Sequence, residues 1–136
     1  MHTQYGVDAA MHFASFINVG DSVHDPRSYY ENNVASGIRF ISALHEAGVK
    51  KFILSSTCAV YGVLNEIRPL SERDAIAPIN PYAACKRMLE TVLADFCTAY
   101  DFHCVVFRSS LAVSGRLTAI VNDYLVLAKP VEAIEV

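Results

Sequence analysis

The stretch Lys51–Ser55, KFILS, is a short apolar run that leads into small polar residues. Such a run predicts a buried strand. On its N-terminal side, Tyr29–Ala47 carries apolar residues at steps of four, three and three, and Gly48 follows in the usual stop position of a helix. On its C-terminal side, Asn80 can cap a second helix with Pro81 at the first position.

Two more apolar runs flank these helices, Ala9–Ala14 and Cys104–Phe107. The order strand, helix, strand, helix, strand is typical of a parallel sheet covered by helices. Right-handed crossovers then place both helices on one face of the sheet. We therefore predict an α/β fold with a parallel sheet of about three strands, whose carboxyl ends form the ligand-binding edge.

The composition fits one folded domain. The chain has 136 residues, of which 53% are apolar and 18% charged, and a formal net charge of −3. These values exclude a disordered chain and a broad nucleic-acid-binding surface. No apolar run reaches the roughly 18 residues of a membrane helix, and the first residues do not resemble a secretory signal. We expect a cytoplasmic protein with no membrane or nucleic-acid partner.

Cysteines and histidines give no sign of a metal site. The four cysteines (Cys58, Cys85, Cys97 and Cys104) contain no CxxC pair, and the five histidines contain no HxxxH pair. Zinc sites and disulfide frameworks normally show such spacing. We therefore predict no metal and four free thiols, as in a reducing compartment.

Tyr82 and Lys86 lie four residues apart on the second predicted helix, so both project from one face. A tyrosine ionises near pH ~10 and is a poor base at neutral pH, but a lysine ammonium one turn away favours the phenolate and lowers its pKa. The pair can therefore act as a proton shuttle. Taken alone, an ordinary surface pair explains this spacing better, so the context decides.

Five stretches supply that context: 11–14 (MHFA), 19–23 (VGDSV), 29–34 (YYENNV), 51–62 (KFILSSTCAVYG) and 80–86 (NPYAACK). Together they resemble the extended short-chain dehydrogenase/reductase family, also called the NAD-dependent epimerase/dehydratase family. Within it they are most like the UDP-glucose 4-epimerase group. The stretches follow the family's order at close to its spacing. The resemblance runs from about Gly6 to Arg108, roughly the middle third of a complete member.

The resemblance implies a role for each matching residue. Tyr82 would be the acid/base at the sugar 4-hydroxyl, Lys86 would hold the nicotinamide ribose, and Thr57 would hydrogen-bond the same sugar hydroxyl. The remaining cofactor-binding positions would be Phe13, Ala14, Asn32, Ser55 and Ser56. For Ser55 and Ser56, simple capping of the strand end remains an equal alternative.

The residues after Thr57 separate two branches of the family. Sugar-nucleotide 4,6-dehydratases place an Asp-Glu pair there, whereas this chain has Cys58 and Ala59. Neither side chain can protonate a leaving hydroxyl as a carboxylic acid does. The resemblance therefore implies an isomerase that uses NAD to invert C4 of a UDP-hexose through a transient 4-keto sugar, in galactose and nucleotide-sugar metabolism.

Three features depart from the family pattern. No three of the six glycines fit the glycine-rich turn that holds the NAD pyrophosphate. Ser109–Leu111 stands where the family has Tyr-Phe-Asn, and residues 115–136 resemble no part of it. We therefore expect a partial NAD-binding Rossmann-like domain at residues 1–114, lacking the N-terminal βαβ unit and the substrate domain, and an unassigned tail at 115–136. We expect such a chain to be weak or inactive alone.

Partners and alternatives follow from the same pattern. The resemblance implies a UDP-hexose substrate and a homodimer through the two helices, and the departures suggest a complementing N-terminal half. The unpaired edge of the first strand also favours association. Two other functions stay open: a non-catalytic remnant or interaction module of the family, and another NAD-dependent sugar-nucleotide epimerase or reductase.

Overall fold

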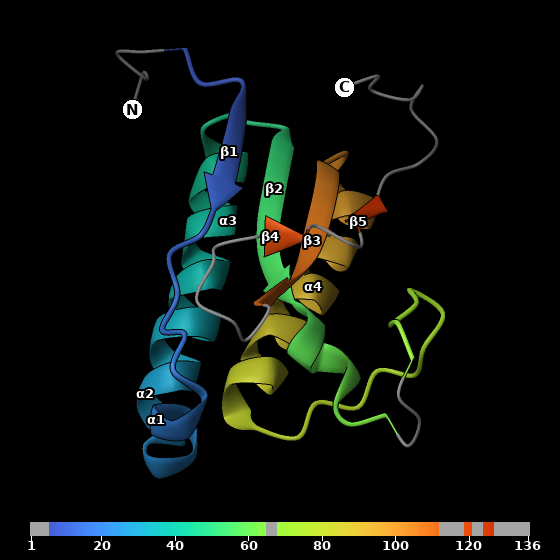
Figure 1. The fold of residues 1–136 in the computed structure, drawn as a ribbon. Coiled ribbons are helices and arrows are strands. Elements are labelled where there is room, and N and C mark those ends of the chain that lie inside the picture. The colour runs from blue at the N-terminus through green and yellow to red at the C-terminus, as the bar shows by residue number, and fades with distance from the viewer. Residues whose placement is uncertain (1–5, 65–67, 112–118, 121–123, 127–136) are drawn as a thin grey trace.

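The computed structural model describes residues 6–64, 68–111, 119–120 and 124–126. The strands are β1 (Ala9–His12), β2 (Lys51–Thr57), β3 (His103–Leu111), β4 (Ala119–Ile120) and β5 (Tyr124–Val126). The helices are α1 (Val19–His24), α2 (Pro26–Tyr29), the π-helical η1 (Tyr30–Ala35), α3 (Ser36–Glu46), the 3₁₀ helix η2 (Cys58–Tyr61) and α4 (Pro81–Tyr100). The predicted order of strands and helices is confirmed (Figure 1).

The sheet has the order β1-β2-β3-β4, and β5 also pairs with β3. Strands β1, β2 and β3 are parallel, with Lys51 of β2 in register with Ala9 on one side and His103 on the other. The predicted three parallel strands are therefore confirmed. The segment 115–136 contributes β4 and β5, which pair with β3 antiparallel. Within the described residues, β1 is the end of the sheet, and its outer edge has no strand partner.

Both long helices, α3 and α4, cover the same face of the sheet, as the right-handed crossovers predict (Figure 1). The core between them and the sheet is apolar. It consists of Ile41, Phe52, Leu54, Leu89, Leu93, Phe102, Cys104 and Val106. The helices approach closely at Gly37, where an added Cβ would lie 2.7 Å from a methyl carbon of Leu89. A larger residue there would force Leu89 out of its packing position.

The predicted helix Tyr29–Ala47 is divided in the structure. It starts earlier, at Pro26, because the Asp25 side chain accepts the backbone N–H of Ser28 and proline fits the first turn. It then passes through the π-helical η1 before α3. Its predicted stop is confirmed, since Gly48 has φ +79°. Among the described residues, none of the helices combines the length and apolar character needed to cross a membrane.

The prediction of four free cysteines is wrong for one pair. Cys97 of α4 and Cys104 of β3 form a disulfide, whereas Cys58 and Cys85 are free. Only Asp101 and Phe102 lie between α4 and β3, and Asp101 has the left-handed φ of 54°. This tight reversal places the last turns of α4 beside the start of β3, which a count of cysteine spacings does not reveal.

Candidate active site

The candidate site forms where β2 ends and α4 begins. Thr57 is the last residue of β2, and its Oγ1 accepts the backbone N–H of Ala59 at 3.2 Å, which starts η2. Helix α4 begins as predicted, because Asn80 Oδ1 accepts the N–H of Ala83 at 2.9 Å and Pro81 is the first helical residue. This start places Tyr82 in the first turn of α4, where the Thr57 side chain is near enough to act on the pKa of its phenol.

Lys86 lies one turn further along α4, and its side chain is only 2% exposed. Its Nζ donates hydrogen bonds to Ser15 Oγ at 2.8 Å and to the backbone oxygen of Ser55 at 2.9 Å. Ser15 follows β1 and Ser55 lies near the end of β2. The lysine amine therefore sits at the carboxyl ends of two parallel strands, 6.0 Å from the centroid of the Tyr82 ring.

Burial dominates the ionisation of both side chains. Burial raises the pKa of Tyr82, and the hydrogen bond with Thr57 lowers it only in part. The pKa of Tyr82 was predicted to fall because of Lys86, whereas in this structure burial raises it. Burial lowers the pKa of Lys86 itself to about 8.

A buried ion pair supports the site from the core. Arg108 of β3 donates from Nε and Nη2 to the two carboxylate oxygens of Glu90, at 3.0 and 2.7 Å, and from Nη1 to Tyr61 Oη at 2.7 Å. Ser56 Oγ donates to the same carboxylate at 2.5 Å. Burial lowers the pKa of Arg108, but the hydrogen bonds and charge of Glu90 outweigh it and raise the pKa above its usual value. The network joins α4 to β2, η2 and β3.

The other predicted cofactor residues lie in different environments. Phe13 and Ala14 are exposed immediately after β1. Asn32 is half-buried in η1, and its amide donates to Asn33 Oδ1 at 2.9 Å. Ser55 is half-buried, whereas Ser56 is buried with its hydroxyl on Glu90. The Ser56 hydroxyl is therefore engaged with the buried ion pair, since successive residues of a strand face opposite sides, and its contact with the cofactor stays a prediction.

Sequence reasoning missed the residue that fixes the segment after β1. Asn33 is fully buried; its Oδ1 accepts the backbone N–H of Phe16 at 2.8 Å, and its Nδ2 donates to the backbone oxygen of Phe16 at 3.0 Å. The Tyr29 hydroxyl donates to the backbone oxygen of Asn18 at 2.6 Å. An asparagine on the apolar face of a helix was the available signal.

Glu90 and Arg108 were also missed as a pair. Tyr82, Lys86 and Glu90 follow one another at steps of four, so all three lie on one face of α4. A carboxylate on that face, between Leu89 and the apolar residues that follow, required a buried cation. The register of β2 and β3 supplies it, since Arg108 lies opposite Ser56.

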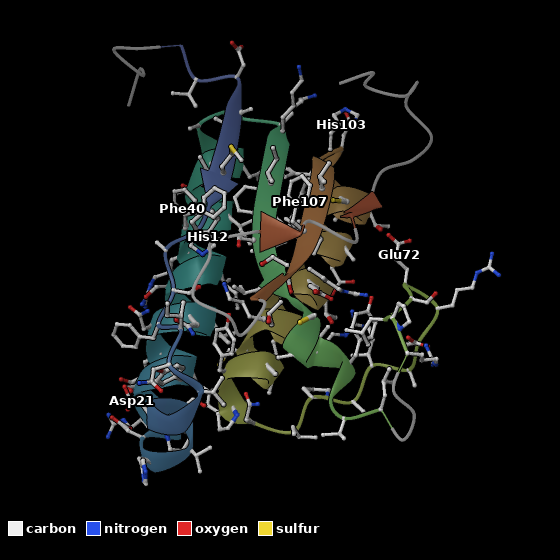
Figure 2. The ribbon with its side chains drawn as sticks, viewed as in Figure 1. His12, Asp21, Phe40, Glu72, His103 and Phe107 are labelled. Atoms are coloured by element: carbon white, nitrogen blue, oxygen red, sulfur yellow. A yellow bond between two sulfur atoms is a disulfide. The ribbon has the colours of Figure 1, made fainter. Side chains whose placement is uncertain are left out.

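His12 is the last residue of β1 and is 8% exposed. Its ring lies beside Phe40 of α3, with centroids 5.3 Å apart (Figure 2), and near Phe52 of β2. Among the described residues, its Nε2 is the one buried side-chain nitrogen or oxygen without a hydrogen-bond partner. Burial and the charge of Lys86 both lower the pKa of His12, so its imidazole is neutral near pH 7.

Comparison with known proteins now places this geometry in a family. The model of the NAD dependent epimerase/dehydratase family matches residues 1–123. The chain belongs to this family. It is 45% identical over 100 residues to the UDP-glucose 4-epimerase of Rhizobium leguminosarum bv. trifolii. The aligned region covers 74% of this chain and 30% of that relative. The resemblance inferred from the motifs is confirmed.

Solved members of the family have the same fold. The UDP-glucose 4-epimerase of Brucella ovis in complex with NAD aligns with a TM-score of 0.71 and 40% identity, over 74% of this chain and 31% of that one. The UDP-Glc/GlcNAc 4-epimerase of Campylobacter jejuni aligns with a TM-score of 0.71 and 41% identity over the same shares. The chain thus spans about a third of the length of the relatives it matches, which confirms a Rossmann-like fragment of a larger fold.

Proposed function

We propose that this chain carries the proton-transfer residues for NAD-dependent inversion at C4 of a UDP-hexose, an isomerase reaction of galactose and nucleotide-sugar metabolism. The observation that supports this most is the convergence of Thr57, Tyr82 and Lys86 where β2 ends and α4 begins. Ligands of open parallel sheets bind at the carboxyl ends of the strands. The 4-epimerase relatives supply the reaction class.

Tyr82 is the proposed acid/base at the sugar 4-hydroxyl, and Thr57 holds that hydroxyl in place. Because burial raises the pKa of Tyr82, its phenol is protonated at neutral pH and acts first as a hydrogen-bond donor. Removal of the phenol proton needs a nearby positive charge. Lys86 lies one turn away on the same face of α4 and is the buried cation placed to provide it.

The residues fit the nicotinamide end of NAD. When bound, NAD would supply a reversible hydride acceptor for C4 of the sugar. The Lys86 ammonium uses two of its three N–H groups within the described chain, so one remains for a ribose hydroxyl. Phe13 and Ala14 are exposed between β1 and Ser15, Asn32 and Ser55 are half-buried, and all four are proposed contacts of the cofactor.

The pyrophosphate end of NAD lacks its usual partner in this chain, since the six glycines form no glycine-rich turn. We therefore propose weak NAD binding by the chain alone, and a complementing polypeptide that supplies the N-terminal βαβ unit along the outer edge of β1. That edge has no strand partner among the described residues, and Met11 and Phe13 are exposed beside it. A homodimer through α3 and α4 is proposed as a separate contact.

Cys58 favours an epimerase over a dehydratase. Burial raises the pKa of its thiol, so the side chain beside Thr57 stays neutral at pH 7 and is a poor proton donor to a leaving hydroxyl. Elimination of water therefore has no acid at this position. A reductase of the same family remains the alternative enzyme, and product analysis separates the two, since a reductase leaves a reduced sugar and consumes a reduced cofactor.

The test has two steps. Calorimetric titration of NAD into the chain is expected to give weak or undetectable binding, and a dissociation constant in the low micromolar range would contradict this. Conversion of UDP-galactose to UDP-glucose is then measured in a chimera, in which residues 6–108 replace the matching segment of the Rhizobium relative. A folded chimera that binds NAD but does not turn over would favour the interaction module over the enzyme.

A further inference from the structure

The Lys86 ammonium is held almost entirely by uncharged groups. Its two hydrogen-bond acceptors are the hydroxyl of Ser15 and the backbone oxygen of Ser55. No carboxylate among the described residues lies within ion-pair distance of its Nζ. The titratable groups that bear on this site are Tyr82 and Cys85 of α4 and His12 of β1.

Ser15 differs from Ser55 because its contact comes from a side chain in a loop. The loop runs from β1 to α1, and its position depends on anchors further along the chain. Phe16, the next residue, is bound at both its backbone N–H and its backbone oxygen by the buried amide of Asn33. Asn18 is bound by Tyr29. These contacts fix the loop directly after the lysine contact, and the pairing of β1 with β2 as far as His12 fixes the chain before it. The Ser15 hydroxyl is therefore held in place before any ligand binds.

We propose that Ser15 is a positioning residue of the candidate site. Its hydroxyl, fixed by the Asn33 clamp on Phe16, holds the Lys86 ammonium at the carboxyl ends of β1 and β2 and leaves one N–H free for a ligand hydroxyl. The role toward a ligand rests on the proposed function, whereas the hold on the ammonium does not. A hydroxyl that accepts from an ammonium stabilises the charged form, which opposes the effect of burial.

The chain is suited to a direct test because it contains four lysines, Lys50, Lys51, Lys86 and Lys129. The full chain is labelled with ¹³C,¹⁵N-lysine, and the Cε and Nζ resonances are followed from pH 6 to pH 11. Ser15→Ala removes the acceptor, and Ser15→Thr keeps a hydroxyl. Ser36→Ala is the matched control, since Ser36 donates to the backbone oxygen of Glu31 in a helix and has no contact with Lys86.

We expect the titration midpoint of Lys86 to fall by about one unit in Ser15→Ala, which corresponds to one hydrogen bond to a charged group at the lower end of its usual strength. The midpoint should return in Ser15→Thr and stay unchanged in Ser36→Ala. A residue that only stabilises the loop would lower the unfolding midpoint of the protein without moving the titration of Lys86. An unchanged Lys86 midpoint in folded Ser15→Ala would overturn the proposal.

Two further measurements keep the proposal testable. If Ser15→Ala does not fold, Ser15→Cys keeps nearly the same shape and replaces the hydroxyl with a thiol, which is only a weak acceptor. In the unmodified chain, the hydrogen-bonded ammonium should show slow proton exchange at Nζ, and fast exchange like that of the exposed Lys51 would also overturn the proposal. Loss of the proposed function would leave these results intact, because none of them needs NAD or a sugar nucleotide.

Discussion

Lys86 and Arg108 are two buried cations on adjoining elements of the same core, and they are stabilised in opposite ways. Lys86 is 2% exposed and contacts a hydroxyl and a backbone oxygen, whereas Arg108 is 4% exposed and is paired with the carboxylate of Glu90. Burial lowers the pKa of Lys86 to about 8. The pKa of Arg108 is raised instead, because Glu90 and Tyr61 outweigh burial.

This difference is the one expected between a charge that holds the core together and a charge that serves a site. Arg108 uses its planar fork on Glu90 and a third nitrogen on Tyr61, so α4, η2 and β3 are held together by a fully paired charge. Lys86 has two hydrogen-bond acceptors among the described residues and lies at the carboxyl ends of β1 and β2, and burial lowers its pKa. A buried amine at a strand end, with no carboxylate partner in the described part of the chain, is the pattern expected of a functional group.

The largest effect should come from a change at Tyr82, the proposed acid/base one turn before Lys86 on α4. In the chimera described above, Tyr82→Phe keeps the ring but removes the proposed acid/base, so turnover should fall by about 10²–10⁴-fold with little change in sugar-nucleotide affinity. Tyr100→Phe is the matched control at the exposed end of α4. Steady-state kinetics of UDP-galactose conversion measures both, and undiminished turnover in Tyr82→Phe would remove the mechanism.

The next effect concerns the paired cation. Glu90→Ala leaves the Arg108 guanidinium buried without its carboxylate, which should lower the free energy of unfolding by about 3–5 kcal/mol. Urea denaturation measures this loss, with Glu46→Ala on the exposed end of α3 as a control that should change stability by under about 0.5 kcal/mol. A loss below about 1 kcal/mol for Glu90→Ala would show that Arg108 finds other partners.

The parallel strands, the two covering helices and the start of α4 at Asn80 were all predictable, because periodicity, caps and βαβ order are local signals. The Thr57, Tyr82 and Lys86 set came from spacing and resemblance. The Glu90–Arg108 pair and the Ser15 contact were not predictable in this way. They join residues 18 and 71 positions apart, and only the register of the strands and the path of the loop bring them together.

Two differences between expectation and structure have the same physical origin. Ser56 was assigned to the cofactor, although the pleat of β2 turns its hydroxyl toward Glu90. The pKa of Tyr82 was expected to fall, although burial raises it and the lysine amine is held elsewhere. In both, sequence spacing gave the correct neighbours but not the side-chain direction or the degree of burial, which depend on the assembled core.

A subtler change tests whether Arg108 acts through its geometry as well as its charge. Arg108→Lys keeps the positive charge but replaces the planar fork with a single ammonium, which cannot bind both oxygens of Glu90 and Tyr61 together. The free energy of unfolding should fall by about 1.5–3 kcal/mol, less than in Glu90→Ala. Equal losses in the two variants, measured by urea denaturation, would mean that charge alone carries little of the stability.

The smallest effect, and the most specific to Lys86, is its pH dependence. The pKa of Lys86 is about 8 in the folded chain, below its value of 10.5 in the absence of burial. Between these two pH values, the unfolded chain holds a proton on Lys86 that the folded chain has released. Stability therefore rises with pH above 8, and this contribution should increase by about 1 kcal/mol between pH 8 and pH 9. In Lys86→Met the contribution is absent.

The measurement is the difference in unfolding free energy between the wild type and Lys86→Met at pH 7, 8, 9 and 10, which cancels the titration of the other groups. Below pH 8, Lys86 of the wild type is protonated in both the folded and the unfolded chain, so folding must bury the full charge. The stability of Lys86→Met relative to the wild type should therefore be largest there. The wild type should then gain on the variant as pH rises. A difference that stays constant across this range would mean that Lys86 remains charged like Arg108, and the contrast between the two cations would be lost.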